Sequence, residues 1–165
     1  MSAARQSADV FLATGQLAVH TGPVKIKTIV GSCVAVCLWD PVARVGGVNH
    51  FLLAQPGPGE PPDTRFGACA TAQLIAEACR AGAARTRLVA AVIGGGHPVH
   101  SIKTHAIGDD NVAVALAVLA EHGVHVVRQE TGGAYGRKLL FNTQTGELIV
   151  RRLNNPVGAL PNVAE

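Results

Sequence analysis

Aromatic and charged residues are both scarce in this chain of 165 residues. Phe, Trp and Tyr account for 4% of the residues and charged residues for 15%, against about 25% charged residues in a typical soluble domain. The 14 Lys and Arg residues are scattered, and only Arg137-Lys138 and Arg151-Arg152 are adjacent. A chain with no basic stripe and few rings for stacking bases is not expected to bind nucleic acid.

Long hydrophobic runs are absent as well. The longest, residues 88–96 and 112–120, are well short of the roughly 18 to 20 residues that cross a bilayer. The N-terminal segment, MSAARQSADVFLATG, lacks the charged-then-apolar pattern of a signal peptide. We therefore expect a cytoplasmic protein that inserts no segment into a membrane.

Cysteine occurs only at Cys33, Cys37, Cys69 and Cys79, and no two of these have CxxC spacing. In a reducing compartment such residues are expected to be free thiols rather than a disulfide framework, and a zinc ribbon would need two close pairs. We expect Cys37, Cys69 and Cys79 to be packing residues. A thiol oxidoreductase stays open as an alternative, and it would require a resolving cysteine near Cys33.

Hydrophobic residues are abundant, at 48% of the chain, and the mean hydropathy is +0.27. Such a chain is not disordered throughout, and its 19 Gly and 9 Pro exclude a coiled coil. Its length fits one domain with a sizeable core. We expect that domain to span residues 10–153, with flexible segments at residues 1–9 and 154–165.

Hydrophobic periodicity predicts two helices and a larger number of strands. The helices are expected at residues 66–81 and 111–122, with Asp109-Asp110 as the cap of the second. The expected strands are residues 24–30, 33–39, 46–53, 87–93, 124–129, 137–141 and 147–152. Together they predict an α/β fold: a single-domain layered α/β sandwich with a mixed, largely antiparallel β-sheet and two main helices.

The stretch AQPGPGEPPDT at residues 54–64 contains four prolines and two glycines. This composition does not form regular helix or strand, and long loops of this kind are often functional. Our hypothesis is that the loop gates a site. Unchanged activity after the loop is shortened would count against it.

Cys33 is the strongest candidate for a chemical role. It follows Gly31-Ser32 at the end of an expected strand, where small residues leave the thiol uncrowded. The same two residues leave backbone N–H groups free to face a developing oxyanion. A nucleophilic thiol also needs a base that generates thiolate near neutral pH.

His50 can supply that base through the pairing of two expected strands. If residues 40–43 form a four-residue turn, Trp39 faces Arg44 and Cys33 lies opposite His50. Directly opposed side chains share a face and have Cβ atoms about 5 Å apart, which allows a Cys–His hydrogen bond. An ordinary explanation stays open for both residues: Cys33 as a buried structural thiol and His50 as a core histidine.

Two further clusters allow alternative interpretations. Gly94-Gly95-Gly96 is glycine-rich enough for a phosphate cradle but lacks a following GK[ST], so a close-packed turn is the simpler interpretation. A histidine cluster suggests a metal site, although we favour a surface loop that carries histidines and expect no metal. Its members are His97, His100 and His105, followed by His122 and His125.

The strings TIVGSCVAVCLWDP at residues 28–41 and GGVNHFLL at residues 46–53 resemble CheD, the family of chemoreceptor glutamine deamidases of bacterial chemotaxis. The GSC and NHF elements at this spacing are specific together, whereas either alone would be weak. Further matches follow in the family's order within residues 10–153: RFG at residues 65–67, GG at 94–95, IGDDNV at 107–112, TGGAYGRK at 131–138 and TGELIVRRL at 145–153.

The resemblance implies roles for the residues at matching positions. The family's nucleophile matches Cys33, its general base matches His50, and its third active-site residue, a threonine upstream of GSC, matches Thr28. Gly31 and Ser32 fall where backbone donors would stabilise an oxyanion. The implied reaction converts a receptor glutamine to glutamate through a thioester, without metal or organic cofactor. The same route would hydrolyse glutamyl methyl esters.

Two functions from different classes follow from the resemblance. As an enzyme, the protein would modify the cytoplasmic helices of methyl-accepting chemoreceptors. As an adaptor, it would bind a CheC-type phosphatase and regulate the dephosphorylation of a response regulator. Alkylation of Cys33 separates the two, because it should abolish deamidation and need not abolish adaptor binding. Ala54, where many relatives have Pro, and residues 94–97 depart from the family pattern and bear on substrate fit.

Overall fold

Strand β3 (Val24–Val30) shows how side-chain alternation separates the two faces of a sheet. Val24, Ile26 and Val30 are buried, whereas Lys25 and Lys27 lie half-buried on the opposite face. This alternation is typical of a strand with one face on the core and the other on solvent. The sheet that contains β3 is therefore an outer layer of the molecule.

The structure is a computed structural model that describes residues 8–97 and 102–156, and its strands form two sheets. One sheet has the order β1-β3-β8-β9 and the other the order β2-β5-β4-β6-β7. The pairs β1–β3 and β6–β7 are parallel and the others antiparallel, so the expected mixed, largely antiparallel arrangement is confirmed. Besides β3, the strands are β1 (Ala8–Phe11), β2 (Leu17–His20), β4 (Val34–Asp40), β5 (Val45–Asn49), β6 (Val89–Gly94), β7 (His125–Thr131), β8 (Tyr135–Asn142) and β9 (Leu148–Pro156).

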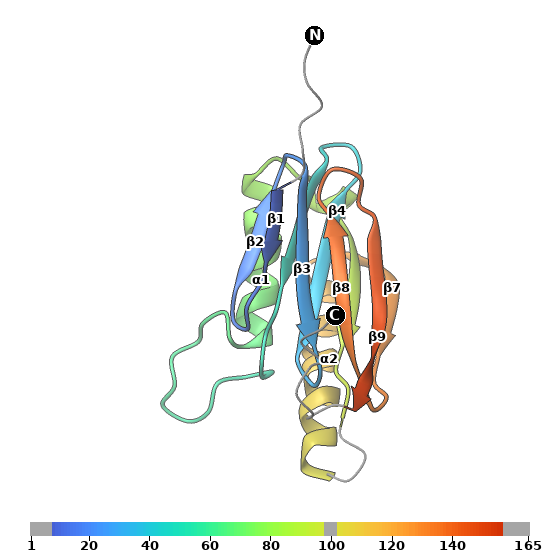
Figure 1. Ribbon diagram of the computed structural model, residues 1–165. Coiled ribbons are helices and arrows are strands. Elements are labelled where there is room, and N and C mark those ends of the chain that lie inside the picture. Colours follow the sequence, from blue (N-terminus) through green and yellow to red (C-terminus); the bar gives the residue numbers. More distant parts are fainter. Residues whose placement is uncertain (1–7, 98–101, 157–165) are drawn as a thin grey trace.

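Helices α1 (Gly67–Arg80) and α2 (Ile102–Glu121) cover one face of the five-stranded sheet. A short 3-10 helix, η1 (Arg85–Arg87), leads from α1 to β6. The four-stranded sheet covers the other face, and Figure 1 shows it in front, with both helices behind. The expected layered α/β sandwich with two main helices is therefore confirmed, and it contains one core on each side of the central sheet.

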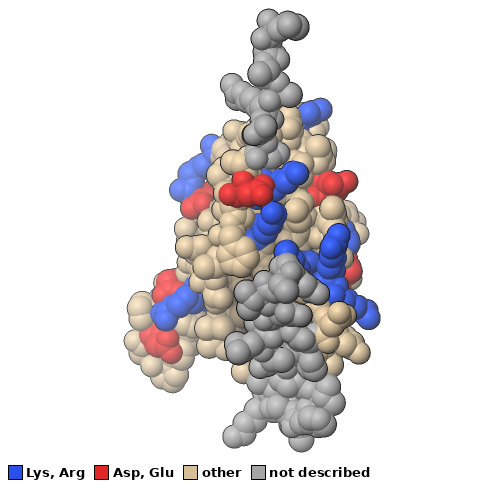
Figure 2. All heavy atoms as spheres, viewed as in Figure 1, with Lys and Arg blue, Asp and Glu red and all other residues tan. Residues whose placement is uncertain are grey.

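The outer face of the four-stranded sheet carries much of the positive charge. Lys27 of β3 forms an ion pair of 3.0 Å with Asp9 of β1, and Lys138 of β8 lies beside Arg151 of β9 in the register. Figure 2 shows Lys and Arg side chains on this face. The polar face points to solvent, so the opposite face of the same sheet is available to line a buried site.

The N-terminal strands β1 and β2 are not predicted by the sequence, because each has only four residues and neither alternates clearly between buried and exposed positions. Strand β1 begins at Ala8 and β9 ends at Pro156, so both strands extend into the segments expected to be flexible. The rest of those segments lies outside the described residues. No helix of the described part is long and apolar enough to span a membrane.

Helix α2 begins at Ile102 rather than near residue 111, so the expected capping role of Asp109 and Asp110 is wrong. Gly108 lies inside the helix, where a Cβ atom would be 2.5 Å from the carbonyl oxygen of Gly95 and 2.6 Å from that of Gly96. A side chain at this position would collide with that backbone. Glycine inside the helix therefore serves a close approach of two backbones rather than a break.

The predicted pairing of the hairpin between β4 and β5 is wrong by two residues. Trp39 pairs with Gly46, not with Arg44, and Cys33 therefore does not lie directly opposite His50. The two residues instead flank an isolated bridge beyond the end of β5. Because the shift is an even number of residues, the side chains stay on the faces that the prediction assigned to them.

Asp40 explains the shift, because it stays in the strand and pairs with Val45. Its carboxylate is fully buried and accepts hydrogen bonds of 2.9 Å from the N–H of Val42 and 3.0 Å from that of Ala43. Arg44 completes the turn with a φ of 54°. The turn therefore spans residues 41–44, closed from inside by an aspartate that the sequence suggested was part of the turn.

Candidate active site

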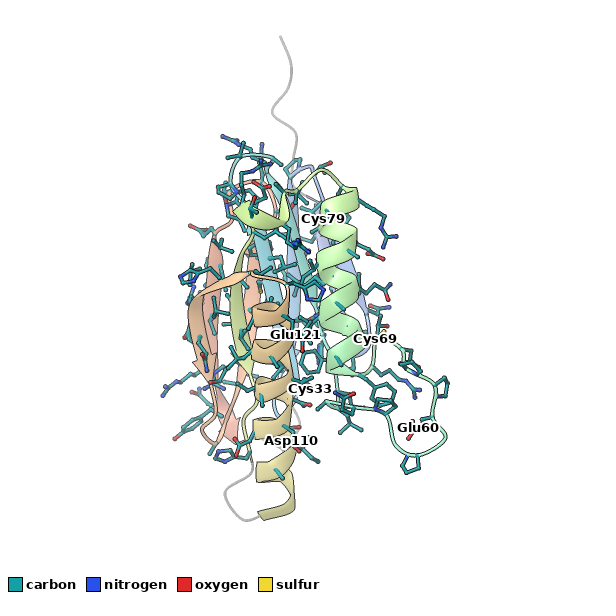
Figure 3. All side chains as sticks on the ribbon, turned by 180° about the vertical axis from the view of Figure 1, so that it is seen from behind. Cys33, Glu60, Cys69, Cys79, Asp110 and Glu121 are labelled. Atoms are coloured by element: carbon teal, nitrogen blue, oxygen red, sulfur yellow. The ribbon has the colours of Figure 1, made fainter. Side chains whose placement is uncertain are left out.

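Cys33 lies immediately before β4 and is half-buried. Its side chain packs against the core between the two sheets, whereas the next residue, Val34, packs on the helix side. Figure 3, seen from the helix side, shows Cys33 toward the end of the molecule from which the loop carrying Glu60 projects. The thiol is therefore held on the inner face of the central sheet.

Hydrogen bonds hold the Gly31-Ser32-Cys33 segment by its carbonyl groups. The N–H of Gly96 donates to the carbonyl of Gly31, and the N–H of Gly95 donates to that of Cys33, both at 2.9 Å. Asn111 donates its side-chain amide to the carbonyl of Ser32 at 3.0 Å. Outside the regular strands of the described part, no backbone carbonyl accepts a hydrogen bond from the N–H groups of Gly31, Ser32 or Cys33.

His50 follows β5 and is 4% exposed. Its Nδ1 lies 2.7 Å from Oγ1 of Thr28, and the Thr28 hydroxyl lies 2.7 Å from the carbonyl oxygen of Leu12. A carbonyl only accepts hydrogen bonds, so the single hydroxyl proton goes to Leu12 and Thr28 must accept from Nδ1–H. This assigns the proton of the neutral ring to Nδ1 and leaves the lone pair on Nε2, as a general base requires.

The register brings Cys33 and His50 to the same side of the central sheet. Val34 and Phe51 form a bridge with two hydrogen bonds, at 3.2 and 3.0 Å, and the two candidate residues are their neighbours. Thr28 belongs to the outer sheet, so its bond to His50 turns the ring toward the layer where Cys33 packs. Diagonal neighbours of this kind lie about 7–8 Å apart, which one water or a change of rotamer can span.

Burial governs the charge of both groups. It raises the pKa of the Cys33 thiol, and the backbone N–H of Cys33 offsets only part of that effect. Burial also lowers the pKa of His50 to about 4, although the carbonyl of Leu12 favours the protonated ring. At neutral pH the two groups are therefore a thiol and a neutral imidazole rather than a thiolate–imidazolium pair.

A groove of about 530 Å³ is lined in part by Asn111, whose side-chain amide donates to the carbonyl of Ser32. Asn111 belongs to its lining and also donates at 3.0 Å to the carbonyl of Leu52, so it ties the groove to both chain segments of the site. The groove runs between the start of the Pro/Gly loop and one face of α2. Its other lining residues are Leu53, Ala54, Gln55, Ile107, Asp110, Ala113 and Val114.

Asn111 has a structural role at the site that the sequence did not predict, whereas Gly94-Gly95-Gly96 form the close-packed turn that it favoured. Asn111 is fully buried, on the same side of α2 as Ala115 and Leu119. A polar residue in the apolar stripe of a helix is a signal of a buried hydrogen-bonding role. The N–H groups of Gly95 and Gly96 are already bonded to the Cys33 segment, which argues against a phosphate cradle.

The remaining cysteines and histidines provide no second site in the described residues. All four cysteines are free, and Cys37 lies four residues along β4 from Cys33. That spacing corresponds to about 13 Å along a strand, too far for a disulfide. No group of three His, Cys, Asp or Glu residues that could hold a metal occurs where side chains are described; His100 and the side chain of His105 lie outside that part.

Comparison with known proteins identifies a family and relatives of this chain. A sequence model of the CheD family, described as CheD chemotactic sensory transduction, matches residues 52–152. A probable chemoreceptor glutamine deamidase CheD 1 of Anaeromyxobacter dehalogenans is 48% identical over 147 residues, which cover 88% of this chain and 85% of that protein. A probable chemoreceptor glutamine deamidase CheD of Bordetella petrii is 41% identical over 133 residues, 79% of this chain and 59% of that protein.

Among solved structures, the crystal structure of a hypothetical protein YfiH from Bacillus licheniformis aligns with a TM-score of 0.48 at 14% identity, covering 69% of this chain and 49% of that one. The fold and the site define the class of this protein: a three-layer α/β protein with a cysteine and a histidine–threonine pair in the layer between its two sheets. The chain belongs to the CheD family.

Proposed function

We propose that this protein converts glutamine side chains of chemoreceptors to glutamate, with Cys33 as nucleophile and His50 as general base. Membership of the CheD family and the names of its relatives support the substrate class. The observation that carries the assignment of the base is the hydrogen bond of 2.7 Å between Thr28 and Nδ1 of His50. That bond leaves Nε2 free to accept a proton on the face that Cys33 shares.

The first half of the reaction forms a thioester. Nε2 of His50 accepts the proton of the Cys33 thiol as the sulfur attacks the carboxamide carbon of a receptor glutamine. The N–H groups of Gly31 and Ser32 are the candidate donors to the oxyanion, because hydrogen bonds to the carbonyls of residues 31–33 fix this segment. The imidazolium then gives its proton to the departing nitrogen, and ammonia leaves.

The second half hydrolyses the thioester. His50, neutral again, accepts a proton from a water molecule that attacks the acyl carbon, and it returns a proton to the sulfur of Cys33. The products are glutamate and the free enzyme, with no change of oxidation state. A glutamyl methyl ester would enter by the same route, with methanol in place of ammonia as the leaving group.

The test is a mass-spectrometric deamidation assay on helical cytoplasmic fragments of chemoreceptors. We expect the wild-type protein to convert specific Gln residues to Glu, and both Cys33→Ala and His50→Ala to lose that conversion. A rate for Cys33→Ala equal to wild type would contradict the role of Cys33. No conversion by the wild-type protein on several receptors would instead favour the adaptor function, and capture of a CheC-type phosphatase would then be tested.

A further inference from the structure

The chain segment at residues 12–16, between β1 and β2, wraps around His50. The N–H of Gly15 donates to the carbonyl of His50 at 2.7 Å, and the N–H of His50 donates to the carbonyl of Gln16 at 3.0 Å. Leu12, at the start of the segment, accepts the hydroxyl of Thr28. The segment is therefore fixed to the backbone of His50 and, through Thr28, to one side of its ring.

Thr14 lies at the tip of this segment, with its hydroxyl 3.4 Å from Nε2 of His50. This is the ring nitrogen that the Thr28 bond leaves with a lone pair. Thr14 is exposed, whereas His50 is buried, so the hydroxyl approaches Nε2 from the solvent side. The two nitrogens of the ring thus each face one threonine hydroxyl, from two different parts of the chain.

We propose that Thr14 is a positioning residue for His50, whose hydroxyl donates to Nε2 of the neutral ring and accepts from Nε2–H of the imidazolium. The proposal rests on the proposed function, in which Nε2 receives the thiol proton. A hydroxyl suits both states because it can donate one hydrogen bond and also accept. Thr14 neither gains nor loses a proton: the S–H bond of Cys33 breaks, the N–H bond forms at Nε2, and the hydroxyl rotates.

The long separation of 3.4 Å is consistent with such an exchange, because a weak hydrogen bond to the neutral ring is easily given up to the incoming thiol. The bond to the imidazolium is charge-assisted and about twice as strong. Thr14 therefore stabilises the charged intermediate more than the resting ring. In kinetic terms this interaction acts on kcat rather than on substrate binding.

The position of Thr14 is also tied to the Pro/Gly loop. The hydroxyl of Thr64, at the end of that loop, donates to the carbonyl of Gly15 at 2.6 Å. Gly15 has a φ of 86°, and a Cβ atom there would lie 3.2 Å from Cγ of Arg65. Loss of the Thr64 hydroxyl should therefore loosen Thr14 without touching His50.

The described groups that form hydrogen bonds with the His50 ring are uncharged, so a change at its Nε2 can be followed without a change of charge in those partners. These partners are the hydroxyl of Thr28 in β3, the hydroxyl of Thr14 in the segment after β1, and the carbonyl of Leu12. Three titratable groups belong to the same layer: Cys33 beside β4, Cys37 of β4 and the buried Arg137 of β8, whose guanidinium donates to the carbonyl of Gly94. No charged side chain of the described residues shifts the pKa of His50.

The kinetic test compares Thr14→Val with Thr14→Ser in the deamidation assay. We expect kcat to fall about tenfold in Thr14→Val, the size of one hydrogen bond to a charged group, with KM nearly unchanged. Thr14→Ser should retain wild-type kcat, and Thr64→Val should show a smaller loss of kcat than Thr14→Val. Thr21→Val is the matched control, an exposed threonine near the same strands, and should behave as wild type.

The second readout needs no substrate. At pH 7 the ¹⁵N NMR shift of Nε2 of His50, assigned with His50→Ala, should move toward the value of an unbonded nitrogen in Thr14→Val and return in Thr14→Ser. An unchanged shift together with wild-type kcat would overturn the proposal, and so would a loss confined to KM. Failure of the proposed function itself appears differently, as a wild-type protein that converts no glutamine.

Discussion

The state of the His50 ring is decided by two hydroxyls and one carbonyl. The Thr28 hydroxyl donates its hydrogen bond to the carbonyl of Leu12 and so must accept one from Nδ1–H of His50. No charged side chain of the described part acts on this ring. A hydroxyl holds the tautomer without supplying the negative charge that an aspartate would bring. Burial lowers the pKa of His50 to about 4, and with no carboxylate to oppose this effect the ring remains a neutral base over the physiological range.

Replacement of Thr28 by Val tests this arrangement directly. Without the hydroxyl, Nδ1–H has lost its acceptor and the ring is free to adopt the other tautomer or to rotate. We expect kcat for deamidation to fall at least about tenfold in Thr28→Val, because one buried hydrogen bond to the base is lost. Thr28→Ser keeps the hydroxyl and should recover most of the rate; equal losses in both variants would contradict this role.

The pH dependence of Cys33 alkylation distinguishes a neutral pair from an ion pair. Burial raises the pKa of Cys33, so the thiolate fraction should be small at pH 7 and increase through alkaline pH. We expect the rate of alkylation by iodoacetamide to rise steadily up to and beyond pH 9. A rate that is already at its plateau at pH 6 would mean a preformed thiolate–imidazolium pair and would contradict this interpretation.

At the scale of elements, the site depends on contacts between α2 and the segment that follows β6. Gly95 and Gly96 bond to the carbonyls of Cys33 and Gly31, and the same two glycines lie against Gly108 of α2. Asn111, one turn further along the helix, reaches the carbonyl of Ser32. Helix α2 thus supports the nucleophile segment through backbone contacts that leave no room for a side chain.

Gly108→Ala is the variant that probes this support. Alanine is favoured over glycine in a helix by about 1 kcal/mol, but its Cβ would lie 2.5 Å from the carbonyl oxygen of Gly95. We expect the collision to outweigh the gain, so that both the thermal midpoint Tm and kcat fall. Gly22→Ala is the control, because a Cβ there meets nothing within 4 Å and should change little. A more stable, fully active Gly108→Ala protein would show that the contact is not needed.

At the scale of the whole molecule, His50 should make stability depend on pH. Its pKa is about 4 in the folded protein and about 6.5 in an unfolded chain, so the unfolded state binds more protons between these values. Stability therefore falls as the pH is lowered from about 6.5 to 4, in total by about 3 kcal/mol. The effect is large because the ring is almost completely buried.

Denaturant unfolding at pH 7 and pH 4.5 measures this effect. The wild-type protein should lose free energy of unfolding between the two pH values, and His50→Asn should lose less. Asp40 is not the cause: burial alone would raise its pKa, but Arg87 and the N–H groups of Ala84, Ala43 and Val42 hold it well below its usual range. Its contribution is lost only as the pH falls below about 4. Equal losses in wild type and His50→Asn would contradict the prediction.

Two secondary-structure elements and the family of this chain are predicted correctly from its sequence. Hydrophobic periodicity predicts β3 at residues 24–30, as observed, and it predicts α1 to within a residue at each end. Cys33, His50 and Thr28 are selected by their types and by resemblance to CheD, and family membership is confirmed. The structure brings Thr28 and His50 into hydrogen-bond contact; the catalytic roles of these residues stay predictions.

What the sequence by itself determined is local: side-chain period, turn-forming residues and the chemical types that make a nucleophile and a base. What only the tertiary structure decided is which distant atoms meet. The buried carboxylate of Asp40, which fixes the register of β4 and β5, is bound by the N–H of Ala84 and the guanidinium of Arg87. Gly108 of α2 is required by the close approach of the Gly95 and Gly96 carbonyls. The contacts of His50 with Thr14 and Thr28 likewise join segments far apart in the chain. Such contacts follow from packing and hydrogen-bond satisfaction across layers, and no periodicity within one segment encodes them.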